Sequence, residues 1–241
     1  MCTVTLIPLQ NSDFILTSNR DESPNRSTLN PNIYSYNDVK LLYPKDKKAG
    51  GTWIGASSNK RVLCLLNGAF ICHKRKESYK LSRGVVVKDL LVCEDVIKTT
   101  ANYNFDNIEP FTLIIVDWNS SLEFYELIWD GKEKHFSKLN KEPQIWSSST
   151  LYTTKMKMER LDWFNTFKSQ NILDAKSILK FHNSTKKENK DYGVIMNRQV
   201  VKTTSITQIE KNESYVNMHF YNLNTKTQSS KSLNYLEVIN E

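Results

Sequence analysis

The sequence predicts an α+β fold with mainly antiparallel sheets. Three observations lead to this prediction: the first third of the chain consists of short apolar strand-like segments, helical patterns follow, and the C-terminal quarter is strand-like again. Runs of strands, then helices, then strands are typical of α+β domains. Because strands at the two ends of the chain can pair in one sheet, we expect a single domain over residues 1–241.

The chain begins with two segments that predict a β-hairpin. "CTVTLIPL" (residues 2–9) is short, apolar and rich in β-branched residues, and "DFILTSN" (13–19) follows the turn signal "QNSD". The hairpin is therefore expected to begin at residue 2. Residues 20–32 are polar and contain two prolines, which predicts a loop.

The middle of the chain predicts a second strand pair and a helix. The strands are residues 49–57 and 61–70, joined by a turn over 58–60. Residues 82–99 have apolar side chains at helical spacing, and Ser82 is a suitable N-cap.

The remaining elements alternate between strand and helix patterns. Strands are predicted at 111–118, 122–130 and 143–150, helices at 155–169 and 174–183, and strands at 200–210, 215–223 and 232–239. No internal repeat or linker interrupts this order.

Composition and charge narrow the class of partner. The net charge is +7, but the lysines are spread thinly, and the densest run, "STKKENKD", mixes acids with bases. Such a run is typical of a solvated loop, so no nucleic-acid partner is expected. The first residues are unlike a signal peptide, and no apolar run is long enough to span a membrane. We expect a cytoplasmic protein that does not insert into membranes.

The four cysteines predict neither a metal site nor disulfides. Cys2, Cys64, Cys72 and Cys93 form no CxxC pair, and their spacing is not that of a disulfide framework. We therefore expect reduced thiols and no bound metal.

Cys2 is the first candidate for chemistry, because it directly follows the initiator methionine. Removal of Met1 would leave Cys2 with a free α-amine, whose pKa is about 7.7–8.0, beside a thiol with a pKa of about 8.5. The amine can take the thiol proton, and the thiolate can then attack a carbonyl carbon. Nucleophile and base would then belong to one residue.

The hairpin would bring Arg20 and Asp21 close to Cys2, because the end of its second strand lies beside the start of its first. A carboxylate there could hold the ammonium, and a guanidinium could lower the pKa of the thiol. The alternative interpretation is an ordinary surface ion pair.

Four motifs together resemble a known family. "MC" at 1–2, "NRDE" at 19–22, "AGGTWIG" at 49–55 and "LLN" at 65–67 are similar to the NRDE family, also called the transport and Golgi organization protein 2 family. This family in turn resembles N-terminal-nucleophile hydrolases of the penicillin acylase and bile-salt hydrolase type. The resemblance implies an αββα four-layer sandwich, with two stacked, mainly antiparallel sheets and the helices outside.

The resemblance also implies catalytic roles. Cys2 matches the nucleophile, Arg20 and Asp21 lie where these hydrolases keep an arginine and an aspartate, and Asn67 matches an asparagine of the oxyanion hole. Ser148 stands where a second asparagine is expected. Loss of one oxyanion donor can cost about 10²–10³ in rate.

Further residues are candidates for binding substrate. Asn19 and Glu22 flank the arginine–aspartate pair, and Trp53 either lines a ligand pocket or belongs to the core. The resemblance implies a late arginine, for which Arg198 and Lys202 are the candidates.

For function, the resemblance implies a cysteine hydrolase that cleaves the C–N bond of a small acyl amide without a cofactor. Two alternatives stay open: an intracellular haem-binding or haem-trafficking protein, which the family also suggests, and a scaffold that keeps the fold without the chemistry. The hydrolase and the haem-binding protein would each have a small molecule as partner. Hydrolases of this kind often assemble, which leaves a homo-oligomer open.

Overall fold

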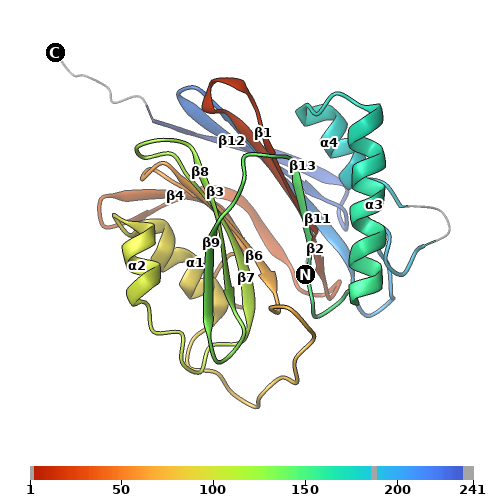
Figure 1. Ribbon diagram of the computed structural model, residues 1–241, viewed down its shortest axis with the longest axis horizontal. Coiled ribbons are helices and arrows are strands. Elements are labelled where there is room, and N and C mark those ends of the chain that lie inside the picture. The colour runs from red at the N-terminus through yellow and green to blue at the C-terminus, as the bar shows by residue number, and fades with distance from the viewer. Residues whose placement is uncertain (1–2, 186–188, 236–241) are drawn as a thin grey trace.

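The computed structural model describes residues 3–185 and 189–235. Two antiparallel sheets stack face to face, and helices cover their outer faces (Figure 1). The predicted αββα arrangement of stacked antiparallel sheets with outer helices is confirmed.

The first sheet has six strands in the order β10-β1-β2-β11-β12-β13. Their bounds are β1 (Thr3–Pro8), β2 (Phe14–Glu22), β10 (Gln144–Ser147), β11 (Lys202–Asn212), β12 (Tyr215–Asn222) and β13 (Thr227–Asn234). β1 and β2 form the predicted hairpin, with a short 3₁₀ turn at Gln10–Ser12 between them. β1 also pairs with β10, so that both of its edges are hydrogen-bonded.

The second sheet is a seven-stranded meander in which consecutive strands pair. Its strands are β3 (Thr28–Tyr36), β4 (Val39–Asp46), β5 (Ile54–Ser57), β6 (Arg61–Asn67), β7 (Phe111–Asp117), β8 (Glu123–Trp129) and β9 (Lys134–Lys138). The predicted strand pair at 49–57 and 61–70 corresponds to β5 and β6.

Four helices lie outside the sheets among the described residues: α1 (Arg83–Val92), α2 (Val96–Asn102), α3 (Thr154–Gln170) and α4 (Ala175–His182). α1 packs on β4, β5 and β6, whereas α3 packs on β10 and α4 on β2 and β11 (Figure 1). No helix in the described part of the chain has the length and apolar character needed to span a membrane.

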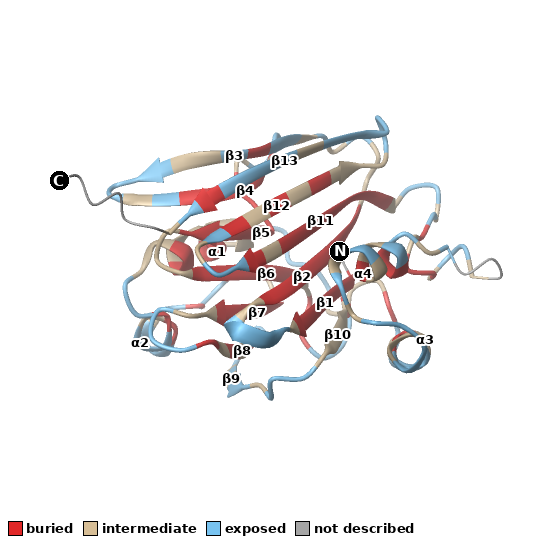
Figure 2. Cartoon of the chain, turned by 90° about the horizontal axis from the view of Figure 1, so that it is seen from above, coloured by how far each residue is buried: buried red, intermediate tan, exposed pale blue. Residues whose placement is uncertain are grey.

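The core follows the alternation of side chains along the strands. In β1, Val4 and Leu6 belong to the large apolar cluster between the sheets, while Ile7 belongs to a smaller cluster beneath α3 and α4. Figure 2 shows the buried residues concentrated in the central strands of both sheets. The first sheet is therefore covered on both faces.

The loop predicted at residues 20–32 is wrong, because β2 continues to Glu22 and β3 begins at Thr28. Pro31 lies where the β3–β4 register shifts, between Leu29 and Asn32. β3 is an edge strand, and edge strands and bulges tolerate a proline that cannot donate a ladder hydrogen bond. Pro24 lies in the short turn between β2 and β3, whereas Pro31 does not mark a loop.

The single helix predicted at 82–99 is two helices. Ser82 is the N-cap of α1, as predicted, and accepts a hydrogen bond from the N–H of Gly84. The buried guanidinium of Arg61 donates to the carbonyls of Leu90 and Cys93 at 2.9 and 2.8 Å, which satisfies the end of α1. Asp95 then caps α2.

The later predictions hold with shifted boundaries. The two helices predicted at 155–169 and 174–183 are confirmed as α3 and α4, and the strands at 200–210 and 215–223 as β11 and β12. The last strand lies earlier than predicted, at 227–234 instead of 232–239, and residues 236–241 lie outside the described part.

His182, at the end of α4, ties that helix to the hairpin. Its ring is fully buried, with Nδ1 2.7 Å from Asn19 Oδ1 and Nε2 2.8 Å from Thr5 Oγ1. Since the Asn19 oxygen can only accept, Nδ1 carries the proton and Nε2 accepts from the threonine hydroxyl. Both neutral ring nitrogens are thus satisfied, and burial lowers the pKa of His182 to about 3.

This histidine predicts a loss of stability in mild acid. Below pH 6.5 the unfolded chain takes up a proton at His182, while the folded chain stays neutral until about pH 3. From pH 7 to 5 the free energy of unfolding should fall by about 2 kcal/mol through this residue. Urea denaturation should show a smaller pH dependence for His182→Asn than for wild type. An equal dependence in wild type and His182→Asn would contradict the assignment.

Candidate active site

The candidate site surrounds the first described residue of β1. Cys2, the predicted nucleophile, lies outside the described residues. Thr3, the residue that follows it, is paired with Ser147 of β10 and Asn19 of β2. The start of β1 is therefore held inside the first sheet, and the residues on its two sides define the site.

Arg20 lies on the face of β2 that looks toward the second sheet. Its guanidinium is 1% exposed, donates to Asp46 Oδ2 at 2.5 Å, and lies 4.6 Å from the centre of the Trp53 ring. It also donates to the carbonyl of Arg26 at 3.1 Å. Its described carboxylate partner is therefore Asp46 of β4, across the sandwich, and not the adjacent Asp21.

Asp21 lies on the opposite face of β2, as successive residues of a strand do. Its carboxylate accepts from the hydroxyls of Tyr152 at 2.6 Å and Thr203 at 2.7 Å. Burial and the nearby Asp21 charge raise the pKa of Tyr152 well above its usual range, so the phenol remains a donor. The carboxylate is thereby fixed in orientation at the end of β2.

A buried arginine that the sequence analysis did not single out organises the same face. Arg160 of α3 donates to the hydroxyls of Thr3 and Ser147 and to the carbonyl of Gly193. Its guanidinium also lies 4.1 Å from the centre of the Tyr152 ring. The available signal is its position four residues before Phe164, which places both on the buried face of α3.

Asn67 and Ser148 lie in contact through the backbone of Asn67. The Ser148 hydroxyl donates to the Asn67 carbonyl oxygen at 2.7 Å and lies 3.0 Å from the Thr150 hydroxyl. Gly68 follows Asn67 with φ +81°, and a Cβ there would lie 3.0 Å from Thr150. This close approach favours glycine and fixes the end of β6, where the Asn67 side chain begins.

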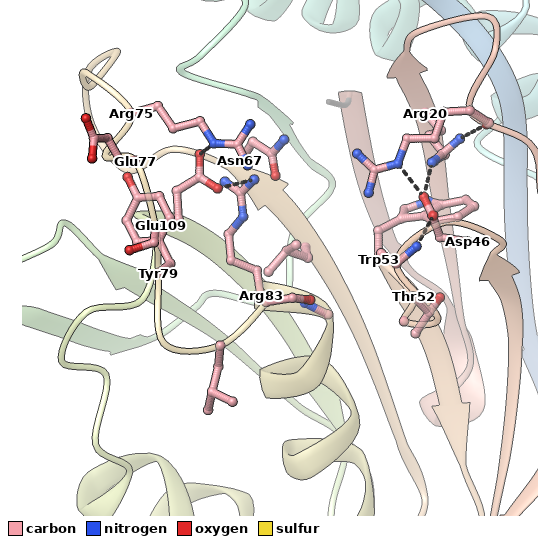
Figure 3. A pocket seen from close by; sticks show the side chains of 18 residues that line it. Arg20, Asp46, Thr52, Trp53, Asn67, Arg75, Glu77, Tyr79, Arg83 and Glu109 are labelled. Atoms are coloured by element: carbon pink, nitrogen blue, oxygen red, sulfur yellow. Dashed lines mark hydrogen bonds and ion pairs between the residues drawn. The ribbon is translucent and has the colours of Figure 1, made fainter.

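A cavity of about 440 Å³ lies next to Arg20. Residues of β2 and β6 and of the start of α1 line it. Three predicted site residues line it: Arg20, Trp53 and Asn67. Figure 3 shows Arg20 and Trp53 on one side of the cavity and Arg83 on the other. Its volume is in the range of small-molecule sites.

Asn19 and Glu22, predicted to contact substrate, do not line this cavity. The Asn19 amide donates to the carbonyls of His182 and Val194 at 2.9 and 2.8 Å, on the α4 side of the sheet. Glu22 pairs with Arg26 at 3.1 Å. Asn19 thus anchors α4. Glu22 does not line the cavity itself, but it orients Arg26, which does.

Arg198, the candidate late arginine, also lies away from the cavity lining. It donates to the carbonyls of Asp191 at 2.7 Å and Leu151 at 2.9 Å, and its guanidinium lies 5.5 Å from the Tyr152 ring centre. It therefore contacts the Asp21 network through Tyr152. Lys202, the other candidate, begins β11.

The described residues contain no group of three or more His, Cys, Asp or Glu side chains arranged to hold a metal ion. Of the three described cysteines, Cys64 is buried, Cys93 is half-buried and Cys72 is exposed.

Solved structures of an amidase ortholog, an acylase and a hydrolase share this fold. The Caenorhabditis elegans ortholog of N-acylethanolamine-hydrolyzing acid amidase matches with a TM-score of 0.59 at 11% identity, covering 86% of this chain and 92% of its own. Penicillin V acylase from Agrobacterium tumefaciens gives 0.56 at 11%, covering 97% and 86%. The C2A mutant of conjugated bile acid hydrolase from Clostridium perfringens gives 0.50 at 11%, covering 100% and 99%. The fold is thus that of the N-terminal-nucleophile hydrolases.

Sequence comparison gives the family. A search against curated protein sequences returned no match. The family model described as Transport and Golgi organisation 2 matches residues 1–234, nearly the whole chain. This protein therefore belongs to the Transport and Golgi organisation 2 family.

Proposed function

We propose that the protein is a cysteine amidohydrolase that cleaves the C–N bond of a small acyl amide. Cys2 is the nucleophile and its own α-amine is the base. The observation that carries the proposal is the arrangement around the start of β1: Asp21 on one face, and Arg20 on the other beside a cavity. This arrangement supports the proposal, because a carboxylate can hold an ammonium and a guanidinium can favour a thiolate.

The proposed reaction balances without a cofactor. After Met1 is removed, the α-amine of Cys2 takes the thiol proton, and the thiolate attacks the amide carbon. The tetrahedral intermediate collapses as the ammonium gives its proton to the leaving nitrogen, which releases an amine and leaves a thioester. Water, deprotonated by the same amine, then attacks the thioester, and the acid leaves as the thiol is restored.

The neighbouring residues take distinct roles in this proposal. The Arg20 guanidinium favours the thiolate through its positive charge. Asp21 holds the ammonium, because a carboxylate has acceptor sites beyond the two that Tyr152 and Thr203 use. The Asn67 amide donates to the developing oxyanion. Ser148 acts indirectly, because its hydroxyl donates to the Asn67 carbonyl and so positions that residue.

The names of the structural neighbours support the reaction class. An amidase, a penicillin acylase and a conjugated bile acid hydrolase share the fold, and the last was solved with the cysteine at its second position replaced by alanine. At 11% identity these likenesses support amide hydrolysis only as a class.

The haem-binding alternative has less support. The described residues that line the cavity include one tyrosine, Tyr79, but no histidine, methionine or cysteine to serve as an axial ligand. The lining also carries seven charged side chains, which differs from the apolar cleft that a haem requires. A protein that keeps the fold but lacks the chemistry is the outcome if the following tests fail.

We predict that Met1 is removed in the cell and that the mature protein releases an amine from small N-acyl amides. Intact-mass measurement checks the first statement, and a fluorescent amine assay checks the second. Cys2→Ala should abolish release, whereas Cys72→Ala, which removes an exposed thiol, should leave it unchanged. Retention of Met1 would rule out the amine-assisted mechanism.

The Cys2 thiol should also be unusually reactive. With its pKa lowered by Arg20, iodoacetamide should label Cys2 at pH 7 faster than the exposed Cys72, and the buried Cys64 should react slowest. Arg20→Ala should slow the labelling of Cys2 about tenfold, since an adjacent opposite charge shifts a pKa by about one unit or more. Arg20→Lys, which keeps the charge, should retain most of the rate. Equal labelling of Cys2 and Cys72 would contradict activation of this thiol.

A further inference from the structure

The cavity beside Arg20 has a net positive lining. Four arginines and three carboxylates contribute to it: Arg20, Arg26, Arg75, Arg83, Asp46, Glu77 and Glu109. The formal charge of the lining is therefore +1. Only four of the lining residues are apolar and larger than glycine: Ala49, Trp53, Leu65 and Leu81. A long hydrocarbon chain would find little matching surface here.

Two of the arginines pair closely with carboxylates in the walls. Arg20 contacts Asp46 at 2.5 Å, and Arg83 contacts Glu109 at 3.0 Å, with side chains that are 1% and 14% exposed. These two ion pairs lie on opposite sides of the cavity (Figure 3). Within each pair the two side chains fix one another's position in the cavity wall and neutralise one another's charge.

The other two arginines keep hydrogen-bond donors available. Arg26 uses Nε for Asp46 at 2.7 Å and Nη1 for Glu22 at 3.1 Å, and its Nη2 has no partner among the described residues. Arg75 has one described contact, from Nε to Glu109 at 3.9 Å, and its side chain is 78% exposed. Both guanidinium groups can therefore donate to a ligand that enters the cavity.

Two more polar atoms of the lining residues lack partners among the described residues. They are the indole Nε1 of Trp53, whose side chain is 3% exposed, and the buried Oδ1 of Asn67. Buried tryptophan N–H groups usually find an acceptor. The donor on Trp53 and the acceptor on Asn67 suit the carbonyl and the N–H of an amide.

We propose that this cavity selects a small monoanionic amide, with the amide near Trp53 and Asn67 and its carboxylate held by Arg26 and Arg75. One carboxylate can accept from both guanidinium groups, and the formal charge of the lining has the sign that attracts an anion. The first turn of α1, at Arg83 and Gly84, adds a weak positive potential at the same cavity. This inference rests on the proposed function, because it names the substrate class of the same site.

Matched ligands test the inference by binding, without turnover. Calorimetry on the Cys2→Ala protein would compare N-acetylglycine, which carries one carboxylate, with its neutral counterpart N-acetylglycinamide. We expect N-acetylglycine to bind at least tenfold more tightly. Arg26→Gln and Arg75→Gln should each remove most of this preference. Lys74→Gln removes the same charge from an exposed neighbour outside the lining and should change the affinity less than twofold.

The inference would be overturned by no detectable binding of N-acetylglycine or by equal affinity for the two ligands. An equal loss of affinity for N-acetylglycine in Lys74→Gln and Arg75→Gln would overturn it as well. Tighter binding of inorganic phosphate than of N-acetylglycine would also overturn it in favour of a dianion site. Thermal unfolding of each variant checks that the fold is retained. If the preference is found but wild type releases no amine, the proposed hydrolysis fails while the binding inference stands. Equal hydrolysis of both amides would sustain the reaction and reject the selectivity.

Discussion

The buried guanidinium of Arg160 holds the beginning of β1 in place, and the candidate site depends on that position. It donates to the hydroxyls of Thr3 and Ser147 and to the carbonyls of Tyr192 and Gly193, so that one side chain joins β1, β10, α3 and the segment before β11. An arginine cannot lose its charge in a protein, and a buried charge is costly unless its donors are satisfied. The acceptors around Arg160 must therefore stay in this arrangement for the fold to be stable.

The alternation of side chains along β2 divides the site between two environments. Asp21 points toward the α3 side, where Tyr152 and Thr203 fix its carboxylate, whereas Arg20 points between the sheets, where Asp46 and Trp53 fix its guanidinium. Arg20 and Asp21 are neighbours in the sequence, but their side chains do not pair with one another. The start of β1, which pairs with β2, therefore has the carboxylate of Asp21 on one face of the sheet and the guanidinium of Arg20 on the other. The proposed chemistry uses both groups.

Local patterns were sufficient for much of the fold but not for its edges. The hairpin β1–β2, the α1 cap at Ser82, and α3 and α4 follow from apolar periodicity and capping chemistry. Residues 28–32 of β3 were predicted as a loop because Pro31 disfavours a central strand, and only the place of β3 at the edge of the sheet makes this proline acceptable. The break between α1 and α2 depends on Arg61, which is distant in sequence and therefore invisible to a local pattern.

The sequence alone determined the helices and most strands, but not β3, β4 or β9. It also gave the family motifs and the candidate residues Arg20, Asp21 and Asn67, because periodicity and motif spacing are local properties of the chain. The tertiary structure decided which partners these residues have. It paired Arg20 with Asp46, gave Asp21 to Tyr152, turned Asn19 toward α4 and gathered four arginines around one cavity. Contacts of this kind join residues far apart in the chain, and they form only where packing brings two faces together and burial requires each polar group to find a partner.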